Sequence, residues 1–415
     1  MLQPYREVLS RPGALAFSSA GVLARLPMSM VGIGIVLMVS EIYGSYGLAG
    51  RVAAVEVVAH AICSPLLARL VDRYGQARIM RPALAVTVLG LAALVAIALL
   101  RASPWFLYAA AAVSGASIGS VGALIRARWS HLLRDPRDVH TAYSLESALD
   151  ELVFIIGPVL ATLLATGVQP VAGLVVPLVA VVVGGLLLYG QRATEPPPVQ
   201  RNPDVRHTHV MRSGGMIVLA VVFIAMGSIF GATDVATVAF AEEEGSKGSA
   251  GVILAVFAAG SMISGLIYGA HHWASPLWRR FAIGMVALAL GVSLFFFVTS
   301  LPVLAAVMFV AGFAIAPTLV NGNGLVQELV PRAQLTEGLT WVGTSLGIGV
   351  SVGSSVAGAL IDRSGSHSGF VVVVVSAGFA VLAVLASLRT LRAGPRESGT
   401  VLLREPTTDP MGDPA

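Results

Sequence analysis

Five ionisable side chains stand out among those that fall within long apolar stretches of this chain, where a charge is costly to place. They are Arg25, Glu56, Asp150, Glu151 and Asp234. A charged side chain at the centre of a lipid bilayer costs about 2.5–3.5 kcal/mol or more, so such residues are rare and usually functional. Carboxylates in that setting can carry protons, and an arginine can attract an anionic group. These five residues are therefore the proton and substrate candidates of the sequence.

Arg25 and Glu56 lie at similar depths in the first two apolar stretches. If both stretches are helical, Arg25 is ~17 Å from one edge and Glu56 ~13 Å from the opposite edge, at ~1.5 Å per residue. This geometry predicts an Arg25–Glu56 pair. Two interpretations stay open: Arg25 attracts an anionic substrate group or tunes Glu56 as a proton carrier, or the pair is static and pins two helices together.

The fifth stretch opens with a group of acidic residues. Glu146 and Asp150 are four residues apart and share a helix face, whereas Glu151 points about 100° away. If this helix begins near residue 143, Glu146 lies at the headgroups, and Asp150 and Glu151 are ~10 Å deep. One of the two could bind the arginines of the loop at 69–81 while the other titrates, or the segment is a solvated amphipathic start of the helix. Asp234, near the outer end of the seventh stretch, lines a cavity or caps its entrance.

The elements that must position these residues are hydrophobic helices. Of the 415 residues, 56% are hydrophobic and 12% are charged, whereas soluble domains carry about 25% charged residues. Twelve apolar stretches are each close to or above the ~20 residues that a spanning helix needs. They run over residues 14–39, 47–68, 79–100, 104–125, 143–165, 169–190, 214–240, 249–270, 281–299, 302–327, 338–360 and 369–388. Because lipid cannot pair with backbone polar groups, we predict an all-α integral membrane protein with twelve transmembrane helices.

The twelve stretches divide into two groups of six around a proline-rich polar segment. We predict an N-terminal six-helix bundle over 1–190, a cytoplasmic linker over 191–213, a C-terminal six-helix bundle over 214–392 and a disordered cytoplasmic tail over 393–415. The segments RDVHTAYSLE (137–146) and RAQLTEGLTW (332–341) share an Arg and a Thr at the same offset before the fifth stretch of each group. This match favours a duplicated, pseudo-symmetric 6+6 arrangement.

Basic residues predict the orientation of the chain. With a cytoplasmic N-terminus, the Lys and Arg residues that do not fall on the inner side are Arg51, Arg101, Lys247, Arg363 and the embedded Arg25. This is the positive-inside pattern, so we predict a multi-pass protein of the cell membrane with both termini cytoplasmic. The net charge of +4 then reflects topology, and no nucleic-acid partner is expected.

One cytoplasmic loop collects charge around a glycine. It reads Ala68-Arg-Leu-Val-Asp-Arg-Tyr-Gly-Gln-Ala-Arg78. With the 6+6 arrangement, this loop resembles the major facilitator superfamily of transporters, whose loop between helices 2 and 3 reads roughly G-x-L-a-D-R-x-G-R-K/R. Ala68 stands where glycine is usual, Gln76 and Ala77 replace the two bases, and Arg78 supplies one base a position later. The matching residues are Leu70, Asp72, Arg73 and Gly75.

Physical chemistry suggests a role for this loop as a conformational latch. Gly75 permits a tight turn with positive φ, Asp72 can lie against the positive end of a neighbouring helix, and Arg73 and Arg78 can reach carboxylates or lipid phosphates. Such contacts hold in one conformation and break in the other, as alternating access requires. The alternative is that these are positive-inside arginines of a short loop.

One residue pair and two asparagines complete the candidate set. Gly157-Pro158 in the fifth stretch partly matches G-x-x-x-G-P-x-x-G-G of the antiporters in that superfamily, and Pro158 can kink the helix. The superfamily's arginine in span four is absent, because Ala111 holds that position. Asn321 and Asn323, in the tenth stretch, are weakly polar cavity candidates.

The resemblance implies a function that composition alone does not. It implies a secondary transporter, with proton-coupled efflux of a small, amphipathic compound by alternating access; proton-coupled uptake, and a scaffold or receptor that has lost transport, remain alternatives. The expected partners are the substrate, protons and the bilayer, and the expected state is a monomer. The sequence shows no Walker lysine loop, nucleophile set or metal-ligand spacing, so we expect no enzyme activity, cofactor or metal.

Overall fold

The structure of the chain, a computed structural model, describes residues 3–198, 209–246 and 249–392, with the exception of the side chain of Tyr46. The first half contains α1 (Gln3–Leu9), α2 (Ala14–Tyr43), α3 (Tyr46–Tyr74), α4 (Gln76–Leu99), α5 (Pro104–Ile118), α6 (Val121–Leu132), α7 (Pro136–Gly167) and α8 (Ala172–Gly190). The second contains α9 (Gly214–Glu243), α10 (Ser249–Gly269), α11 (Leu277–Ser293), α12 (Leu301–Gly312), α13 (Ile315–Leu329), α14 (Leu335–Ser364), α15 (Ser366–Ala386) and α16 (Leu388–Arg392).

Twelve of the helical segments are long and apolar enough to cross a membrane, which confirms the predicted fold class. The fourth span is divided into α5 and α6 at Gly119, whose φ is 65°. The tenth is divided into α12 and α13. Part of the predicted linker (199–208) and the predicted tail (393–415) lie outside the described residues.

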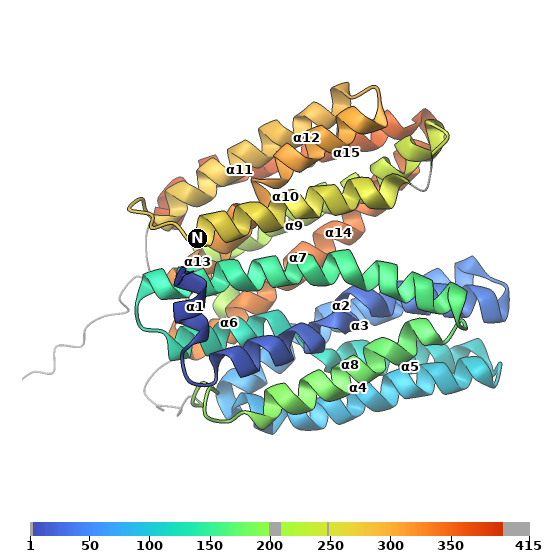
Figure 1. Cartoon of the computed structure of the whole chain (residues 1–415), viewed down its shortest axis with the longest axis horizontal. Helices are drawn as coiled ribbons and strands as arrows, with labels where there is room; N and C mark the ends of the chain where they lie inside the picture. The colour runs from blue at the N-terminus through green and yellow to red at the C-terminus, as the bar shows by residue number, and fades with distance from the viewer. Residues whose placement is uncertain (1–2, 199–208, 247–248, 393–415) are drawn as a thin grey trace, which may run out of the picture.

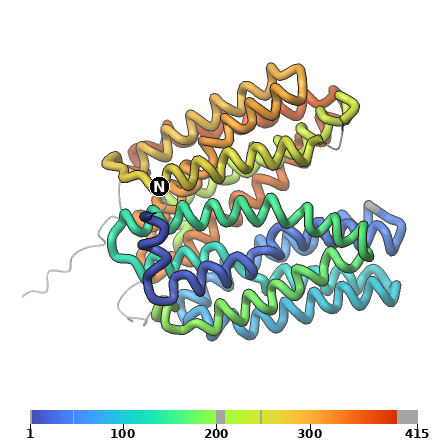
Figure 2. Tube along the Cα trace, in the orientation of Figure 1, coloured from blue at the N-terminus to red at the C-terminus, as the bar shows by residue number. Residues whose placement is uncertain are grey.

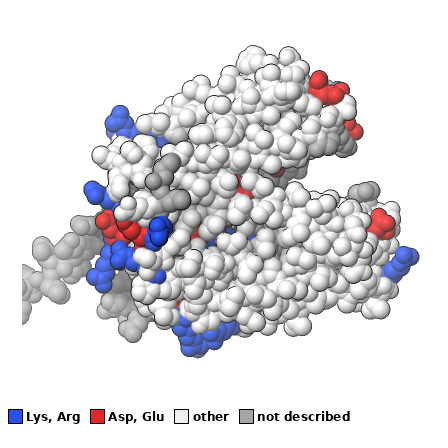
Figure 3. Space-filling model, in the orientation of Figure 1, with Lys and Arg blue, Asp and Glu red and all other residues white. Residues whose placement is uncertain are grey.

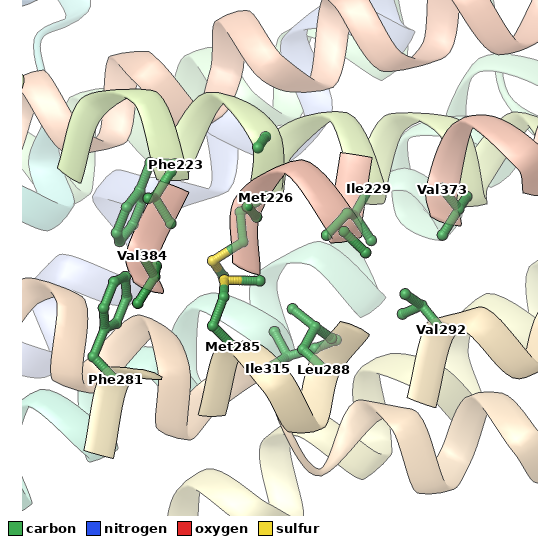
Figure 4. Packing of buried hydrophobic residues seen from close by; sticks show 14 of the residues in the cluster. Phe223, Met226, Ile229, Phe281, Met285, Leu288, Val292, Ile315, Val373 and Val384 are labelled. Carbon is green, nitrogen blue, oxygen red and sulfur yellow. The ribbon is translucent and has the colours of Figure 1, made fainter. Parts of the chain in front are cut away.

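The two groups of helices form separate bundles that lie side by side (Figures 1 and 2). One hydrophobic core is built from α2–α8 and another from α9–α15. Figure 4 shows the second core, where Phe223 and Met226 of α9 face Phe281 and Met285 of α11. The rings of Phe223 and Phe281 stack at 6.4 Å between centroids. Each bundle therefore buries most of its apolar side chains in a core of its own, and among the buried residues that the structure describes only Ala123 of α6 and Val320 of α13 pack in the core of the opposite bundle.

The bundles meet at the end that carries α1 and the connection from α8 to α9, which we call the inner end. There, the Tyr5 hydroxyl donates to the Leu266 carbonyl at 2.6 Å, and the Thr141 hydroxyl donates to the Gly269 carbonyl at 2.8 Å. Burial raises the pKa of Tyr5, so its hydroxyl stays a donor at neutral pH. At the opposite, outer end the bundles separate, and Figure 3 shows the surface hollowed between them. The molecule is closed at one end and open at the other.

Several spans extend further than the sequence predicted. The predicted charged loop is helical on both sides of Gly75, because α3 continues to Tyr74 and α4 begins at Gln76. Two other extensions bear on the buried charges. The fifth helix begins at Pro136 and not near residue 143, because Asp135 caps it by accepting from the Arg137 N–H at 2.9 Å. The fourth span continues to Leu132, past the predicted end at residue 125. Both extensions place charged residues in helices where the sequence predicted loops, and one of these residues belongs to the site described below.

Candidate functional site

A buried cluster of four charged side chains lies between α2, α6 and α7. Arg25 of α2 is its centre and is fully buried. Its Nη1 lies 2.8 Å from Asp150 Oδ1, and its Nη2 contacts Glu146 Oε2. Nη1 also donates to the Glu146 carbonyl at 3.3 Å. One arginine thus ties α2 to two successive turns of α7.

Glu146 has a complete set of donors. In addition to Arg25, the Ser18 hydroxyl donates to its Oε1 at 2.8 Å and the Trp129 indole N–H donates to the same oxygen at 2.6 Å. The side chain is fully buried. A buried carboxylate that is paired and hydrogen-bonded in this way is a structural element of the bundle, since removing any partner would leave a costly charge.

Asp150 is held differently, because each of its oxygens faces a different arginine. Oδ1 pairs with Arg25, and Oδ2 lies 2.8 Å from Nη2 of Arg126 in α6. The Asp150 side chain is 20% exposed and that of Arg126 is 9% exposed, whereas Arg25 and Glu146 are closed to solvent. Asp150 and Arg126 therefore form the accessible side of a cluster with two positive and two negative groups.

The accessible side of the cluster connects to the inner closure. The Arg126 guanidinium lies 6.0 Å from the centroid of the Tyr143 ring. The amide of Gln327, on α13 of the other bundle, donates to the Tyr143 hydroxyl and to Ser130. The Tyr143 ring is therefore the single side chain between the Asp150–Arg126 pair and Gln327 of the other bundle, so a movement of Arg126 can alter this contact between the bundles.

The predicted Arg25–Glu56 pair is wrong. Arg25 pairs with Glu146 and Asp150 because α7 packs on α2 at this height, whereas α3 turns Glu56 toward α5. The backbone of Glu56 touches Gly115, where any side chain would collide. Glu56 is 9% exposed, and the structure assigns it no hydrogen-bond partner among the described residues.

The other predicted acidic candidates lie in different surroundings. Glu146 does not lie at the headgroups, because α7 begins seven residues earlier than expected and carries Asp150 about 21 Å into the helix at ~1.5 Å per residue. Glu151 faces the other bundle, where its Oε1 accepts from the Ser261 hydroxyl of α10 at 2.6 Å. Asp234 is exposed on α9 and takes no part in the cluster. In the described residues, Asp150 and Glu151 pair with none of the arginines of the loop at 69–81.

The charged loop lies at the inner end, where Asp72 crosses to the other bundle. Asp72 Oδ2 accepts from the Glu337 N–H at 2.9 Å and also bonds to Thr336, at the start of α14. Gly75 has a φ of 95°, and a side chain there would meet Glu195. Arg73 and Arg78 are exposed, with guanidinium groups 4.8 and 5.9 Å from the centroid of the Tyr74 ring.

The helix-five motif and the two asparagines also have defined surroundings. Gly157 lets Ser29 of α2 approach α7, where the Ser29 hydroxyl donates to the Val153 carbonyl at 3.0 Å. Pro158 lies inside the continuous helix α7. Asn321 is 1% exposed and bonds the Tyr268 hydroxyl at 2.9 Å, so it lines no open cavity in this conformation. Asn323 is half-buried.

The sequence did not predict one member of the cluster, Arg126, or two donors to Glu146, Trp129 and Ser18. The fourth apolar stretch of the sequence, 104–125, ends one residue before Arg126 and so predicts that Arg126 lies outside the span. A helical signal was present, since Arg126 and Trp129 are three residues apart and share a face when the helix continues. In the part of the chain that the structure describes, no group of three or more His, Cys, Asp or Glu residues is arranged to hold a metal ion.

Comparison with known proteins agrees with this architecture. Among solved structures, the chain is similar to a bacterial homologue of the iron transporter ferroportin in an outward-facing state, with a TM-score of 0.73, 14% identity, and coverage of 90% of this chain and 98% of that one. It is also similar to the human organic anion transporter MFSD10 (TETRAN), with a TM-score of 0.65, 14% identity, and coverage of 91% and 97%. At such identities the likeness concerns the fold.

Sequence comparison supplies the family. No curated protein sequence matches the chain. The family model described as Major Facilitator Superfamily matches residues 17–280 and 235–410, which together cover nearly the whole chain. The chain therefore belongs to the Major Facilitator Superfamily of secondary transporters.

Proposed function

We propose that this transporter is a proton-coupled exporter of small, amphipathic compounds, and that it works as a monomer in the cell membrane with both termini cytoplasmic. The orientation rests on the excess of Lys and Arg at the inner end. With the inner end cytoplasmic, the structure is an outward-facing conformation. Efflux is favoured over uptake by Gly157-Pro158, the partial antiporter motif.

The observation that carries proton coupling is the position of Asp150 between two arginines on the accessible side of the cluster. A proton on Asp150 removes the negative charge that holds Arg126 at 2.8 Å. Arg126 is then free to shift against the Tyr143 ring, which bonds to Gln327 of the other bundle. Protonation at the site would in this way loosen the inner closure, which is the link that coupled transport needs.

Two other carboxylates are rival carriers. Glu151 accepts from Ser261 across the bundles, so its protonation would also change an inner contact. Glu56 is buried without a hydrogen-bond partner among the described residues, which makes a permanent charge there costly. We choose Asp150 over these two because its protonation would release Arg126, which reaches the inner closure through Tyr143. Two arginine partners stabilise the charged carboxylate, so in this proposal the Asp150–Arg126 pair must open before Asp150 takes up a proton.

The inner loop serves as a latch in this proposal. Asp72 places a negative charge on the start of α14, where backbone N–H groups lack intrahelical partners and the helix dipole is positive. The contact joins the bundles only while the inner ends are closed. Asp72 therefore favours the conformation seen here, and the inward-facing conformation must break this contact.

Compound-induced proton movement tests the proposed function. Everted membrane vesicles that contain the protein would be acidified by respiration, and a panel of cationic, neutral and anionic amphipathic dyes would be added while a pH-sensitive dye reports the lumen. An exporter should show proton release with at least one compound, and vesicles with an Asp150→Asn variant should show none. A wild-type protein that moves no protons with any compound, although it binds some of them, would favour the scaffold or receptor alternative.

A further inference from the structure

The turn that follows α14 repeats the turn that follows α3. Residues 71–75 read Val-Asp-Arg-Tyr-Gly, and residues 361–365 read Ile-Asp-Arg-Ser-Gly. Both glycines end their helix with a positive φ, 95° at Gly75 and 79° at Gly365. The Gly75 N–H donates to the Val71 carbonyl at 2.8 Å, and the Gly365 N–H donates to the Ile361 carbonyl at 2.9 Å. The same local structure therefore occurs at the inner end of one bundle and at the outer end of the other.

Each turn is also held in the same way by a carboxylate from another segment. Glu195 accepts from the Ala77 N–H at 2.8 Å at the start of α4, and Glu243 accepts from the Ser366 N–H at 2.7 Å at the start of α15. Both following helices begin at the residue after the glycine. The turns thus present Asp72 and Asp362 from similarly fixed positions, three residues before the glycine.

The two aspartates differ in what they touch. Asp72 binds the first turn of α14 at the closed inner end. Asp362 is exposed at the open outer end, and the structure records no hydrogen bond or ion pair for it within the described ranges. An aspartate in a rigid turn with no partner is unexplained in this conformation.

The pairing of α3 with α14 indicates where the missing partner lies. The two helices pack against each other and run in opposite directions. Asp72 meets Glu337, the third residue of α14. Asp362 lies 25 residues after Glu337, and Gly47 lies 25 residues before Asp72. If the same antiparallel register continued to the outer ends, Asp362 would lie opposite Gly47 and Leu48, the second and third residues of α3.

The start of α3 can accept such a partner. The Ser45 hydroxyl accepts from the Leu48 N–H at 3.2 Å, whereas the Gly47 N–H has no acceptor among the described residues. The facing outer halves of both helices carry small residues that are open in this conformation. These residues are Gly47, Gly50 and Ala54 on α3, and Ser351, Ser355 and Gly358 on α14.

We infer that Asp362 is a second positioning residue of the transport cycle: when the outer ends close, it binds the backbone N–H groups at the start of α3, as Asp72 binds the start of α14 in the conformation seen here. This inference rests on the proposed alternating access. Asp72 favours the outward-facing state and Asp362 the inward-facing state, so each conformation has its own aspartate on its own helix start. The Asp72 and Asp362 contacts join α3 and α14 at opposite ends. Their relative strengths set the ratio of the outward-facing to the inward-facing state.

Distances between spin labels at the outer ends would test this. In a Cys63→Ser background, cysteines replacing the exposed Leu100 and Phe297 would report outer opening in reconstituted protein. Asp362→Asn should reduce the outer-closed fraction relative to the open fraction by about 2- to 5-fold, the range expected when a negative charge is removed from a helix start. Asp72→Asn should shift the ratio in the opposite direction, and the double variant should return it toward wild type. Glu244→Gln, another exposed outer carboxylate, is the matched control and should change nothing.

A backbone variant makes the test specific. Gly47→Pro removes the expected N–H donor but is tolerated in the first turn of a helix. It should act like Asp362→Asn, and the two together should shift the ratio no further than either alone. An unchanged ratio in Asp362→Asn, while Asp72→Asn shifts it, would overturn the second contact and leave the transporter proposal standing. If every variant shows a single outer-open population and the vesicle assay shows no proton movement, both the Asp362 contact and the proposed proton-coupled transport would be overturned.

Discussion

At the scale of residues, the site contains charges with two different functions. Glu146 is enclosed by Arg25, Ser18 and Trp129, and nothing in its surroundings can change without loss of a buried contact. Asp150 pairs with Arg25 as Glu146 does, but its second oxygen pairs with Arg126, which is partly exposed. We interpret the first as the fixed support of the cluster and the second as the group that changes charge during transport.

Replacement of Arg25 should destabilise the protein more than a typical mutation does. Arg25→Met leaves Glu146 buried without its charge partner, which costs about 3–5 kcal/mol. The measurement is thermal unfolding of the purified protein in detergent. Adding Glu146→Leu to Arg25→Met removes the unpaired charge and should recover part of the loss. A melting temperature in Arg25→Met equal to that of wild type would mean that the cluster does not hold α2 against α7.

Replacement of Asp150 should separate coupling from substrate movement. Asp150→Asn mimics the neutral form, so downhill exchange of substrate should survive while accumulation driven by a pH gradient is lost. The measurement is uptake of a transported dye into proteoliposomes with and without a pH gradient. Glu56→Gln and Glu151→Gln should both keep gradient-driven accumulation. If Glu56→Gln loses it and Asp150→Asn keeps it, the proton is carried by α3.

At the scale of elements, α7 joins the site to the helix contacts around it. It starts at a capped Pro136, carries Glu146 and Asp150 on one face and Glu151 toward α10, and passes Gly157 where α2 comes closest. One helix therefore contacts the charge cluster, the other bundle and the first span. Any tilt of α7 changes all three contacts together.

A side chain at position 157 should disturb this helix pair. Gly157→Ala places a methyl group against Ser29, so α2 and α7 must move apart, and such overpacking costs about 1–3 kcal/mol. Gly167→Ala, in the same helix, meets nothing within 4 Å and is the matched control. Thermal unfolding should show a loss for the first and none for the second. Equal stability of the two variants would show that the α2–α7 contact adjusts without cost.

At the scale of the whole molecule, two bundles with separate cores meet at one end only. Each core consists almost entirely of residues from its own bundle, with Ala123 of α6 and Val320 of α13 packed in the core of the opposite bundle. The contact between the bundles can therefore change while most of each core stays intact. The inner closure consists largely of single hydrogen bonds, such as those of Tyr5, Thr141 and Asp72. Such bonds can be broken and remade at modest cost, as a rocking mechanism requires.

The orientation of the whole molecule is testable by reporter fusion. A reporter placed after Arg192 or at the C-terminus should be active as a cytoplasmic protein, and one inserted at Ser246 should lie outside the cell. The physical reason is the concentration of Lys and Arg in the segments that the sequence places on the side of α1. The reverse pattern would contradict the assignment of the structure as outward-facing.

The sequence by itself determined the class of fold. Twelve apolar stretches in two groups of six predicted the twelve spans in order, because helix-spanning length and hydrophobicity are local properties of the chain. The positions of Arg25 and Asp150 within the membrane were also predictable from the sequence, because each lies inside a single apolar stretch. The resemblance in the loop at 68–78 pointed to the family that the family model then identified.

Only the tertiary structure decided which charges meet. Glu56 and Asp150 were both compatible with Arg25 in depth, and the choice depends on how α2 packs on α7 and how Gly115 draws α3 toward α5. Arg126 entered the site because α6 continues to Leu132 and so places it in a helix, which hydropathy could not show for a charged residue. The partner of Asp72 is 265 residues away in sequence. Contacts between distant segments follow from packing geometry, and no pattern within one segment contains that information.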